Sequence, residues 1–192
     1  MGFVKTAVTD ELQDDGSFLF SSDEENGFVI CKNPDKLKRL LSFLKPGKQV
    51  HYVSDGDWST HDLVMELLKI LGTAEIYFTT YALRETPVRQ LVLAMHRGDI
   101  KFVKMLVDTR AKIRTPAVFE MAKMNFCQVG QTNVHAKVCV IKTANGCVSI
   151  TGSANWTSNP KIEAGVVSMN NELAEFNINW IQNLINDADI FK

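Results

Sequence analysis

Residues 134–155, VHAKVCVIKTANGCVSITGSAN, contain two short strand patterns separated by a turn. Valine and isoleucine recur at alternate positions in 134–142 and again in 147–151, and β-branched residues favour strands. Between these runs, Asn145-Gly146 is a hairpin signal, because both residue types tolerate the backbone angles of a tight turn. The sequence therefore predicts two adjacent antiparallel strands.

The register of this hairpin decides which polar side chains lie opposite each other. A two-residue turn made by the Asn-Gly pair would put polar side chains opposite apolar ones. A three-residue loop over residues 144–146 instead places His135 opposite Asn155 and Lys137 opposite Ser153, so that like faces coincide. We predict the three-residue loop for that reason.

In the rest of the chain, predicted strands alternate with predicted amphipathic helices. Several of the helices carry apolar residues along one face and end at glycine or proline. The order is typical of an α/β fold in which a mixed, mostly parallel β-sheet is sandwiched between helices, and the antiparallel hairpin joins that sheet. The expected strands are 27–31, 49–54, 74–83, 100–108 and 163–169, and the expected helices are 35–44, 60–71, 87–97, 116–125 and 171–185.

Composition and charge indicate one domain preceded by an acidic N-terminal segment. The chain has 192 residues, 45% of them hydrophobic, which is enough to bury a sizeable core. Residues 1–26 carry seven acidic residues and one lysine, whereas 84–123 carry nine lysines and arginines and four acidic residues, within a net charge of −1. The basic stretch is either a surface for a polyanion or a set of solvated helix faces. We predict an acidic N-terminal extension over 1–27 and a single domain over 28–192.

The four cysteines include no CxxC pair, and three of them lie in or beside predicted strands. We interpret them as reduced, buried side chains of a cytoplasmic protein. A zinc site made by Cys127, His135, Cys139 and Cys147 is the alternative, although its spacings match no familiar ligand pattern. The sequence has no run of 18 apolar residues, so we expect no membrane span. We also expect no metal, no cofactor and no membrane partner.

The polar residues of the hairpin form a set suited to a phosphoryl group. Lys137 and Asn155 can donate to phosphoryl oxygens, Ser153 and nearby backbone N–H groups add donors, and Gly152 permits close approach. His135 is then left for bond making, as a nucleophile that forms a covalent phosphoryl intermediate. We therefore predict a catalytic and phosphate-binding site at this hairpin.

Two further residues belong to the expected site. Glu163, in the run KIEAG, is the nearest downstream acid that can orient and charge-stabilise an imidazole. Trp156 either stacks as a wall of the site or packs in the core. The other three histidines lack neighbours at meaningful spacing, and we interpret them as structural.

The runs HAK, GSANWT and EAGVV resemble the signature of the phospholipase D superfamily, the HKD-motif phosphodiesterases. The alternation of strands and helices over about residues 49–186 agrees with that fold. Lys142 stands where the family pattern has an aspartate, and Lys137 is farther from Gly152 than usual. The resemblance implies a metal-independent reaction that needs two motifs, and it assigns the motif positions to His135, Lys137, Ser153, Asn155 and Glu163.

This chain has a single HxK motif, because none of the other histidines is followed by lysine two residues later. Resemblance to the single-motif nuclease branch implies a homodimer in which each protomer supplies one copy of His135. The expected substrate is nucleic acid, DNA more than RNA. Two alternatives stay open: a degenerate nucleic-acid-binding module, favoured by Lys142, or a transferase that acts on lipid or other phosphoryl diesters.

Overall fold

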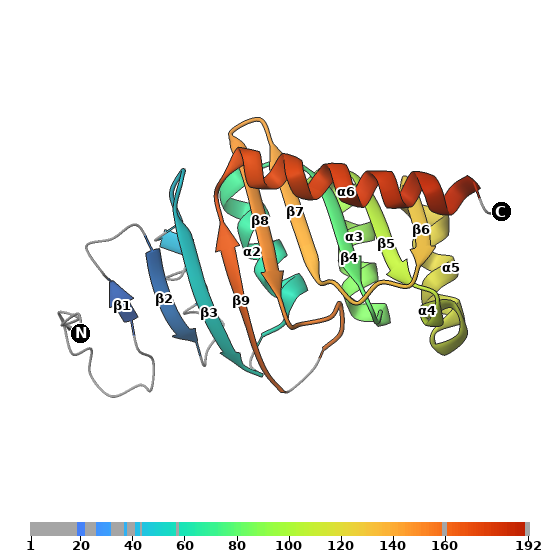
Figure 1. The fold of residues 1–192 in the computed structure, drawn as a ribbon, viewed down its shortest axis with the longest axis horizontal. Helices are drawn as coiled ribbons and strands as arrows, with labels where there is room; N and C mark the ends of the chain where they lie inside the picture. Colours follow the sequence, from blue (N-terminus) through green and yellow to red (C-terminus); the bar gives the residue numbers. More distant parts are fainter. Residues whose placement is uncertain are drawn as a thin grey trace, which may run out of the picture.

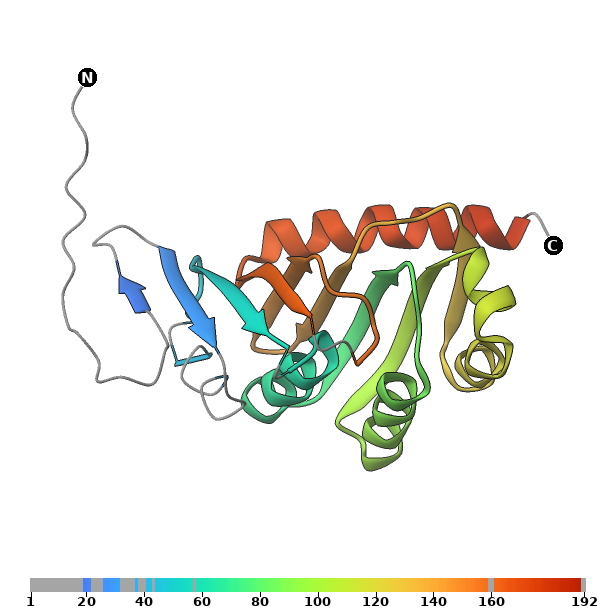
Figure 2. The same ribbon diagram turned by 90° about the horizontal axis from the view of Figure 1, so that it is seen from below.

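The computed structural model describes residues 19–21, 26–31, 37, 41–42, 44–56, 58–158 and 161–190. These residues form one β-sheet with helices on both faces (Figures 1 and 2). Most of the predicted extension 1–27 and of the predicted helix 35–44 lies outside the described residues. The predicted boundary between residues 27 and 28 falls within β2 (Asn26–Cys31), which pairs with β3 (Gln49–Asp55) in the sheet.

The sheet has nine strands in the order β1-β2-β3-β9-β8-β7-β4-β5-β6. Six strands, β2, β3, β8, β4, β5 and β6, run in the same direction, and their carboxyl ends meet at one edge of the sheet. Strands β7 and β9 run antiparallel to their neighbours and begin at this edge. In Figure 1 this is the lower edge. The remaining strands are β1 (Leu19–Ser21), β4 (Ala74–Thr80), β5 (Ile100–Asp108), β6 (Gln128–Thr132), β7 (Val138–Thr143), β8 (Gly146–Gly152) and β9 (Ile162–Ser168).

The mixed α/β architecture predicted from the sequence is confirmed, but the expectation of a mostly parallel sheet is wrong. Parallel pairing occurs between β2 and β3, β4 and β5, and β5 and β6. The other neighbouring pairs are antiparallel. The reason is that the hairpin and β9 insert between β3 and β4 rather than extending the sheet at an edge.

Two apolar cores lie on the two faces of the sheet. One face is covered by α2 (Thr60–Leu71), α3 (Glu85–Arg97) and α5 (Pro116–Asn125), which bury residues such as Leu67, Leu91 and Phe119. The other face is covered by α6 (Asn171–Ile190), which crosses the strands in Figure 1. Figure 2 shows α6 on one side and the other helices on the opposite side. Both faces of the central strands are therefore buried.

The hairpin register differs from the prediction. Thr143 pairs with Gly146, so the turn has two residues, and Lys137 lies opposite Gly152, whose N–H donates to the Lys137 carbonyl at 3.2 Å. The Thr143 hydroxyl donates to the Gly146 carbonyl at 2.9 Å, and Gly146 has a φ of 134°. The prediction failed because it assumed one solvated face. The buried Ser149 hydroxyl instead accepts a hydrogen bond from Asn177 of α6 at 3.3 Å.

Two elements near the site were not predicted from the sequence. Helix α4 (Arg110–Arg114) has only five residues and begins directly after β5. Strand β6 contains two glutamines, a glycine and a threonine in five residues, and it has none of the alternating apolar pattern of a half-buried strand. Tertiary contacts explain its existence, because Gly130 lies against Ile185 of α6, with no room for a side chain. Both elements border the site described below.

Candidate active site

His135 and Lys137 lie in the segment that joins β6 to β7, just before the strand that was predicted to include them. Thr79, near the carboxyl end of β4, anchors this segment. Its hydroxyl donates to the Ala136 carbonyl at 2.9 Å and accepts from the Val138 N–H at 3.1 Å. These two hydrogen bonds to a side chain replace the backbone hydrogen bonds that a neighbouring strand would make. They fix the HxK motif at the lower edge of the sheet.

The two motif side chains contact each other. The ammonium group of Lys137 donates to the His135 carbonyl at 2.7 Å and lies 3.2 Å from Nδ1 of the imidazole. An ammonium group has donors only, so Nδ1 must accept, and the neutral ring carries its proton on Nε2. His135 is exposed and Lys137 is partly buried. In this tautomer the Nε2–H group can donate a hydrogen bond to a ligand.

Glu163 at the start of β9 supplies the negative charge of the site. The Ser153 hydroxyl donates to the Glu163 carboxylate and accepts from the Ala164 N–H at 3.1 Å. Partial burial lowers the pKa of the Lys137 ammonium, and the Glu163 carboxylate opposes that shift. Ser153 therefore positions a carboxylate close enough to Lys137 to favour its charged form.

Two glycines facing each other across β8 and β9 make room for a buried tyrosine. A Cβ atom on Gly165 would lie 2.5 Å from the Tyr52 hydroxyl, and one on Gly152 would lie 3.2 Å from it. Burial raises the pKa of Tyr52 above its ordinary value, and the charge of Glu163 adds to that shift. Tyr52 is thus a neutral hydroxyl beneath the site.

These contacts change the predicted role of Gly152. Its N–H is already bonded to Lys137, and the Ser153 N–H donates to the Ala164 carbonyl at 2.9 Å. Both backbone donors are therefore used within the sheet and cannot serve a phosphoryl oxygen. Gly152 is required by close packing within the sheet rather than by the approach of a substrate, because a Cβ atom there would lie 2.8 Å from the Ala164 carbonyl oxygen and 3.2 Å from the Tyr52 hydroxyl.

Asn155 is held by the loop that follows β4. Its Oδ1 accepts from the Tyr81 N–H at 3.3 Å and from the Thr80 hydroxyl at 3.4 Å. The backbone donor requires that the amide oxygen faces this loop, so the NH₂ group is directed away from it. The carboxamide is fixed in orientation and keeps two N–H donors for a ligand.

Trp156 belongs to the core and does not form a wall of the site. Only 1% of its surface is exposed, and its ring stacks on Phe78 with the centroids 4.2 Å apart. The backbone N–H of Trp156 donates to the Thr80 hydroxyl at 3.2 Å. A base cannot stack on a ring whose face is covered by another aromatic side chain, so of the two predicted alternatives only core packing holds.

A cluster around Tyr81 was missed by the sequence analysis. The Tyr81 ring lies 4.8 Å from the His135 ring, and the guanidinium carbons of Arg110 and Arg114 lie 4.6 and 5.2 Å from its centroid. Tyr81 follows β4 and both arginines belong to α4, after β5. The rule that ligands bind beyond the carboxyl ends of parallel strands would have pointed to this loop and this helix.

The basic stretch 84–123 does not form one basic face. Arg89 pairs with Glu85, Arg97 pairs with Asp99 at 2.8 Å, and Lys104 bonds Gln182 of α6 at 2.6 Å on the opposite face of the sheet. The reading as solvated helix faces fits these residues. The arginines of α4 are the part of the stretch that lies beside the HxK motif.

Lys142, which replaces the family aspartate, lies at the other end of β7. It lies four residues after Val138, which at about 3.3 Å per residue is about 13 Å along the strand. Its ammonium group donates to Glu175 of α6 at 2.8 Å, and this bond raises the pKa of Lys142. Lys142 is part of the contact between the sheet and α6.

The zinc alternative is wrong. Cys139 lies in the core that faces α2 and α3, whereas Cys147 lies in the core that faces α6, so the sheet separates them. Across the described ranges, no three histidine, cysteine or acidic side chains are grouped as metal ligands would be.

Within those same ranges, no helix has the length and apolarity needed to cross a bilayer.

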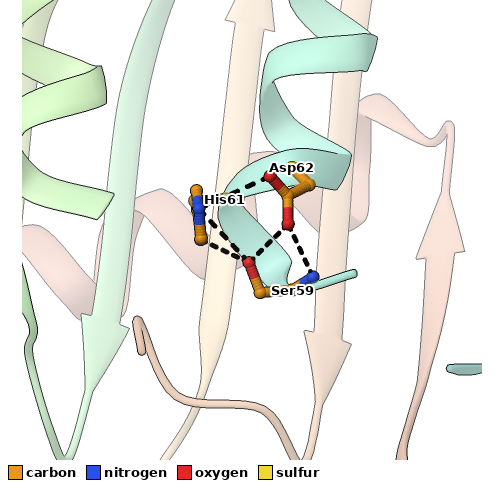
Figure 3. A network of polar contacts seen from close by, with 3 residues as sticks. All are labelled: Ser59, His61 and Asp62. Carbon is orange, nitrogen blue, oxygen red and sulfur yellow. Dashed lines mark hydrogen bonds and ion pairs between the residues drawn. The ribbon is translucent and has the colours of Figure 1, made fainter. Parts of the chain in front are cut away.

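A second polar network, at the start of α2, contains a serine, a histidine and an aspartate (Figure 3). Asp62 accepts from the Ser59 N–H and from the Ser59 hydroxyl, both at 2.8 Å, and its Oδ1 lies 3.4 Å from His61 Nε2. Because the hydroxyl proton is given directly to the carboxylate, the arrangement is not that of a Ser-His-Asp triad. It caps the helix, and His61 is 3% exposed.

This network makes stability depend on pH. Burial lowers the pKa of His61 below 6.5, although Asp62 opposes the shift. The unfolded chain therefore takes up a proton near pH 6.5 that the folded chain excludes, so the free energy of unfolding falls as the pH drops through that value. Urea unfolding at pH 7.5 and 5.5 should show a larger difference for wild type than for His61→Gln. An equal difference in both proteins would contradict the prediction.

Comparison with solved structures identifies the arrangement of strands and helices. Nuc from Salmonella typhimurium, a phospholipase D family member, superposes with a TM-score of 0.55 at 22% identity, over 72% of this chain and 95% of that one. The chain has the phospholipase D fold. No protein-family model matches the sequence, and no curated protein does either.

Two other structures share the phospholipase D fold over part of their length. Polyphosphate kinase from Porphyromonas gingivalis superposes with a TM-score of 0.55 at 14% identity, over 71% of this chain and 26% of that one. The archaeal chromatin protein TrmBL2 superposes with a TM-score of 0.50 at 13% identity, over 80% of this chain and 59% of that one. At such identities the likeness concerns the fold alone.

Proposed function

We propose that this protein is a metal-independent phosphodiesterase, an endonuclease that hydrolyses DNA through a covalent phosphohistidine at a site shared by two copies of the chain. The observation that carries the proposal is the contact between exposed His135 and Lys137 at the edge of a phospholipase D fold. At the same edge lie the Asn155 amide and the Glu163 carboxylate that faces Ser153.

The proposed reaction has two steps. In the first, Nε2 of one His135 attacks phosphorus, the bond from phosphorus to the leaving oxygen breaks, and the other His135 protonates that oxygen. In the second, the deprotonated imidazole takes a proton from water, the resulting hydroxide attacks phosphorus, and the phosphorus–nitrogen bond breaks. Lys137 and the Asn155 NH₂ group donate to the phosphoryl oxygens in both steps.

The two histidine copies need different proton states. The attacking copy is neutral, with a free Nε2 and its proton on Nδ1, whereas the general acid is an imidazolium with a proton on both nitrogens, because a neutral ring that lost its proton would become an imidazolate. Neither state lets Nδ1 accept from Lys137, so this contact must break in both copies when the substrate binds. A phosphoryl oxygen that draws the ammonium group away would produce this change. Substrate orientation thus selects which copy attacks.

The position of Lys142 favours turnover over the binding-only alternative. That alternative rested on the missing aspartate, but Lys142 lies far along β7 and is paired with Glu175 of α6. An ion pair with α6 at that distance affects the packing of the domain. It does not remove a group from the reacting phosphate.

Nucleic acid is the proposed substrate class because of the charges next to the motif. Arg114 extends the positive charge of the site away from His135, as a polyanion with several phosphates requires, whereas Arg110 is paired with Asp108. A lipid diester has one such phosphate and needs an apolar entry surface. The cationic surroundings of Tyr81 therefore favour nucleic acid.

A subunit-mixing experiment tests the shared site. Wild type and His135→Ala protein are mixed in equal amounts, allowed to exchange, and assayed for cleavage of single- and double-stranded DNA in excess chelator. If each site needs two copies of His135, activity falls to about a quarter of that of wild type at the same total protein concentration, because about a quarter of the dimers contain two wild-type chains. Independent sites would give about half. Mixing with His96→Ala, an exposed histidine on α3, should cause no loss.

Three results would contradict the proposal. One is loss of cleavage when metal is chelated, and another is full activity of a monomer. The third is DNA binding without cleavage by both wild type and His135→Ala, which would favour the binding-only alternative. Parallel assays with RNA and with a generic phosphodiester report the substrate class.

A further inference from the structure

A cleft begins where the HxK motif ends. It has a volume of about 310 Å³, within the usual range of ligand-binding sites. Its walls come from the loop after β4, from α4 and from the residues after Trp156. Tyr81 forms the end nearest to His135, and the other lining residues include Arg84, Arg114, Thr115, Thr157 and Ser158.

The two arginines of α4 differ in what neutralises them. Arg110 Nε donates to the fully buried carboxylate of Asp108 at 2.7 Å, and this bond lowers the pKa of Asp108. Over the described part of the chain, no carboxylate pairs with Arg114, whose guanidinium group contacts the Tyr81 ring. Arg114 is an exposed, uncompensated cation in the cleft.

Tyr81 holds cationic groups next to His135. Its ring is in contact with both guanidinium groups of α4 and with the His135 ring. Contact with the ring holds Arg114 by its apolar surface and leaves its N–H groups free to donate. The cleft therefore offers hydrogen-bond donors and positive charge to an anion.

We propose that this cleft binds the phosphodiester next to the one that is cleaved, with Arg114 as its main ligand. The proposal rests on the proposed function, because it takes the scissile phosphate to be at His135. A strand whose scissile phosphate contacts His135 and Lys137 would bring a neighbouring phosphate past Tyr81. The hydroxyls of Thr157 and Ser158 line the same cleft and add donors. Arg114 would thus make the enzyme prefer a polymer over a single diester.

Replacement of Arg114 by glutamine tests the proposal. We expect binding of a DNA oligonucleotide to weaken by about 10-fold, and the slope of log Kd against log salt to decrease by about 0.7 to 0.9. Turnover of bis(p-nitrophenyl) phosphate, which has no neighbouring phosphate, should be unchanged. Lys112→Gln is the matched control, because it removes an exposed cation from the same helix but outside the cleft.

A chemical change in the DNA gives a second measurement. An oligonucleotide of defined cleavage position carries one uncharged methylphosphonate on either side of the scissile phosphate. At one of these positions the change should weaken binding to wild type about as much as Arg114→Gln does, and it should have no further effect on the variant. Equal effects on both proteins, or no effect on either, would overturn the proposal.

The two proposals fail in different ways. Binding that depends on Arg114, without cleavage by wild type, would refute the nuclease and leave the phosphate site standing. Cleavage by wild type with unchanged binding and KM in Arg114→Gln would refute the phosphate site alone. Equal thermal midpoints of the variants and wild type show that the exposed side chain was not needed for folding.

Discussion

Replacing His135 by alanine is expected to lower kcat for DNA cleavage by about 10⁴-fold or more. In a site shared by two protomers, one substitution removes both the nucleophile and the general acid. Stability should change by less than about 0.5 kcal/mol, because the side chain is exposed. Single-turnover cleavage with rapid quenching measures the rate and also traps the phosphohistidine, which should be absent in the variant.

The matched control for this prediction is His96→Ala. His96 is an exposed histidine in the last turn of α3, and it is not among the residues that surround His135. It should retain wild-type kcat. Activity of His135→Ala within 10-fold of wild type, or a phosphorylated histidine that persists in that variant, would refute the histidine mechanism.

Gly165→Ala is expected to destabilise the protein by about 1–3 kcal/mol. The new methyl group would lie 2.5 Å from the Tyr52 hydroxyl and 2.8 Å from the Thr151 carbonyl oxygen. Tyr52 is buried and the other contact is backbone, so neither moves aside easily. For a domain of this size, the midpoint of thermal unfolding should fall by roughly 2–12 °C.

Two companion variants show whether the clash is the cause. Ala164→Ser changes the exposed neighbouring residue and should have little effect on the midpoint. The double variant Gly165→Ala with Tyr52→Phe lacks the hydroxyl closest to the new methyl group. It should be less destabilised than the sum of the two single variants, since the residues are in contact. Additive effects, or a Gly165→Ala protein as stable as wild type, would contradict the packing account.

The local elements were largely predictable because their signals are local. Strand β5 and helix α5 begin and end as predicted, and α2 ends at Leu71, directly before Gly72. The HxK motif and its neighbours in GSAN were predicted as a site from their residue types on the hairpin and from the resemblance to the phospholipase D signature. The short helix α4 and strand β6 were missed, since each is stabilised by neighbours rather than by its own pattern.

The candidate site was only partly predictable, because side chains far apart in the sequence build it. Sequence reasoning proposed His135, Lys137 and Asn155. It did not point to Thr79, which anchors the backbone of the HxK motif, or to the arginines around Tyr81. These residues follow or end strands that become neighbours of the motif only when the sheet forms.

The sequence by itself determined most of the helices and strands and indicated candidate residues for the chemistry, because residue type and periodicity act over a few neighbours. Only the tertiary structure decided the hairpin register and which neighbouring strands run parallel or antiparallel. Helix α6 covers the second face and supplies Asn177 to buried Ser149, so polar residues did not have to share a solvated side. That packing sets Lys137 opposite Gly152 and pairs Lys142 with α6, far from the HxK motif.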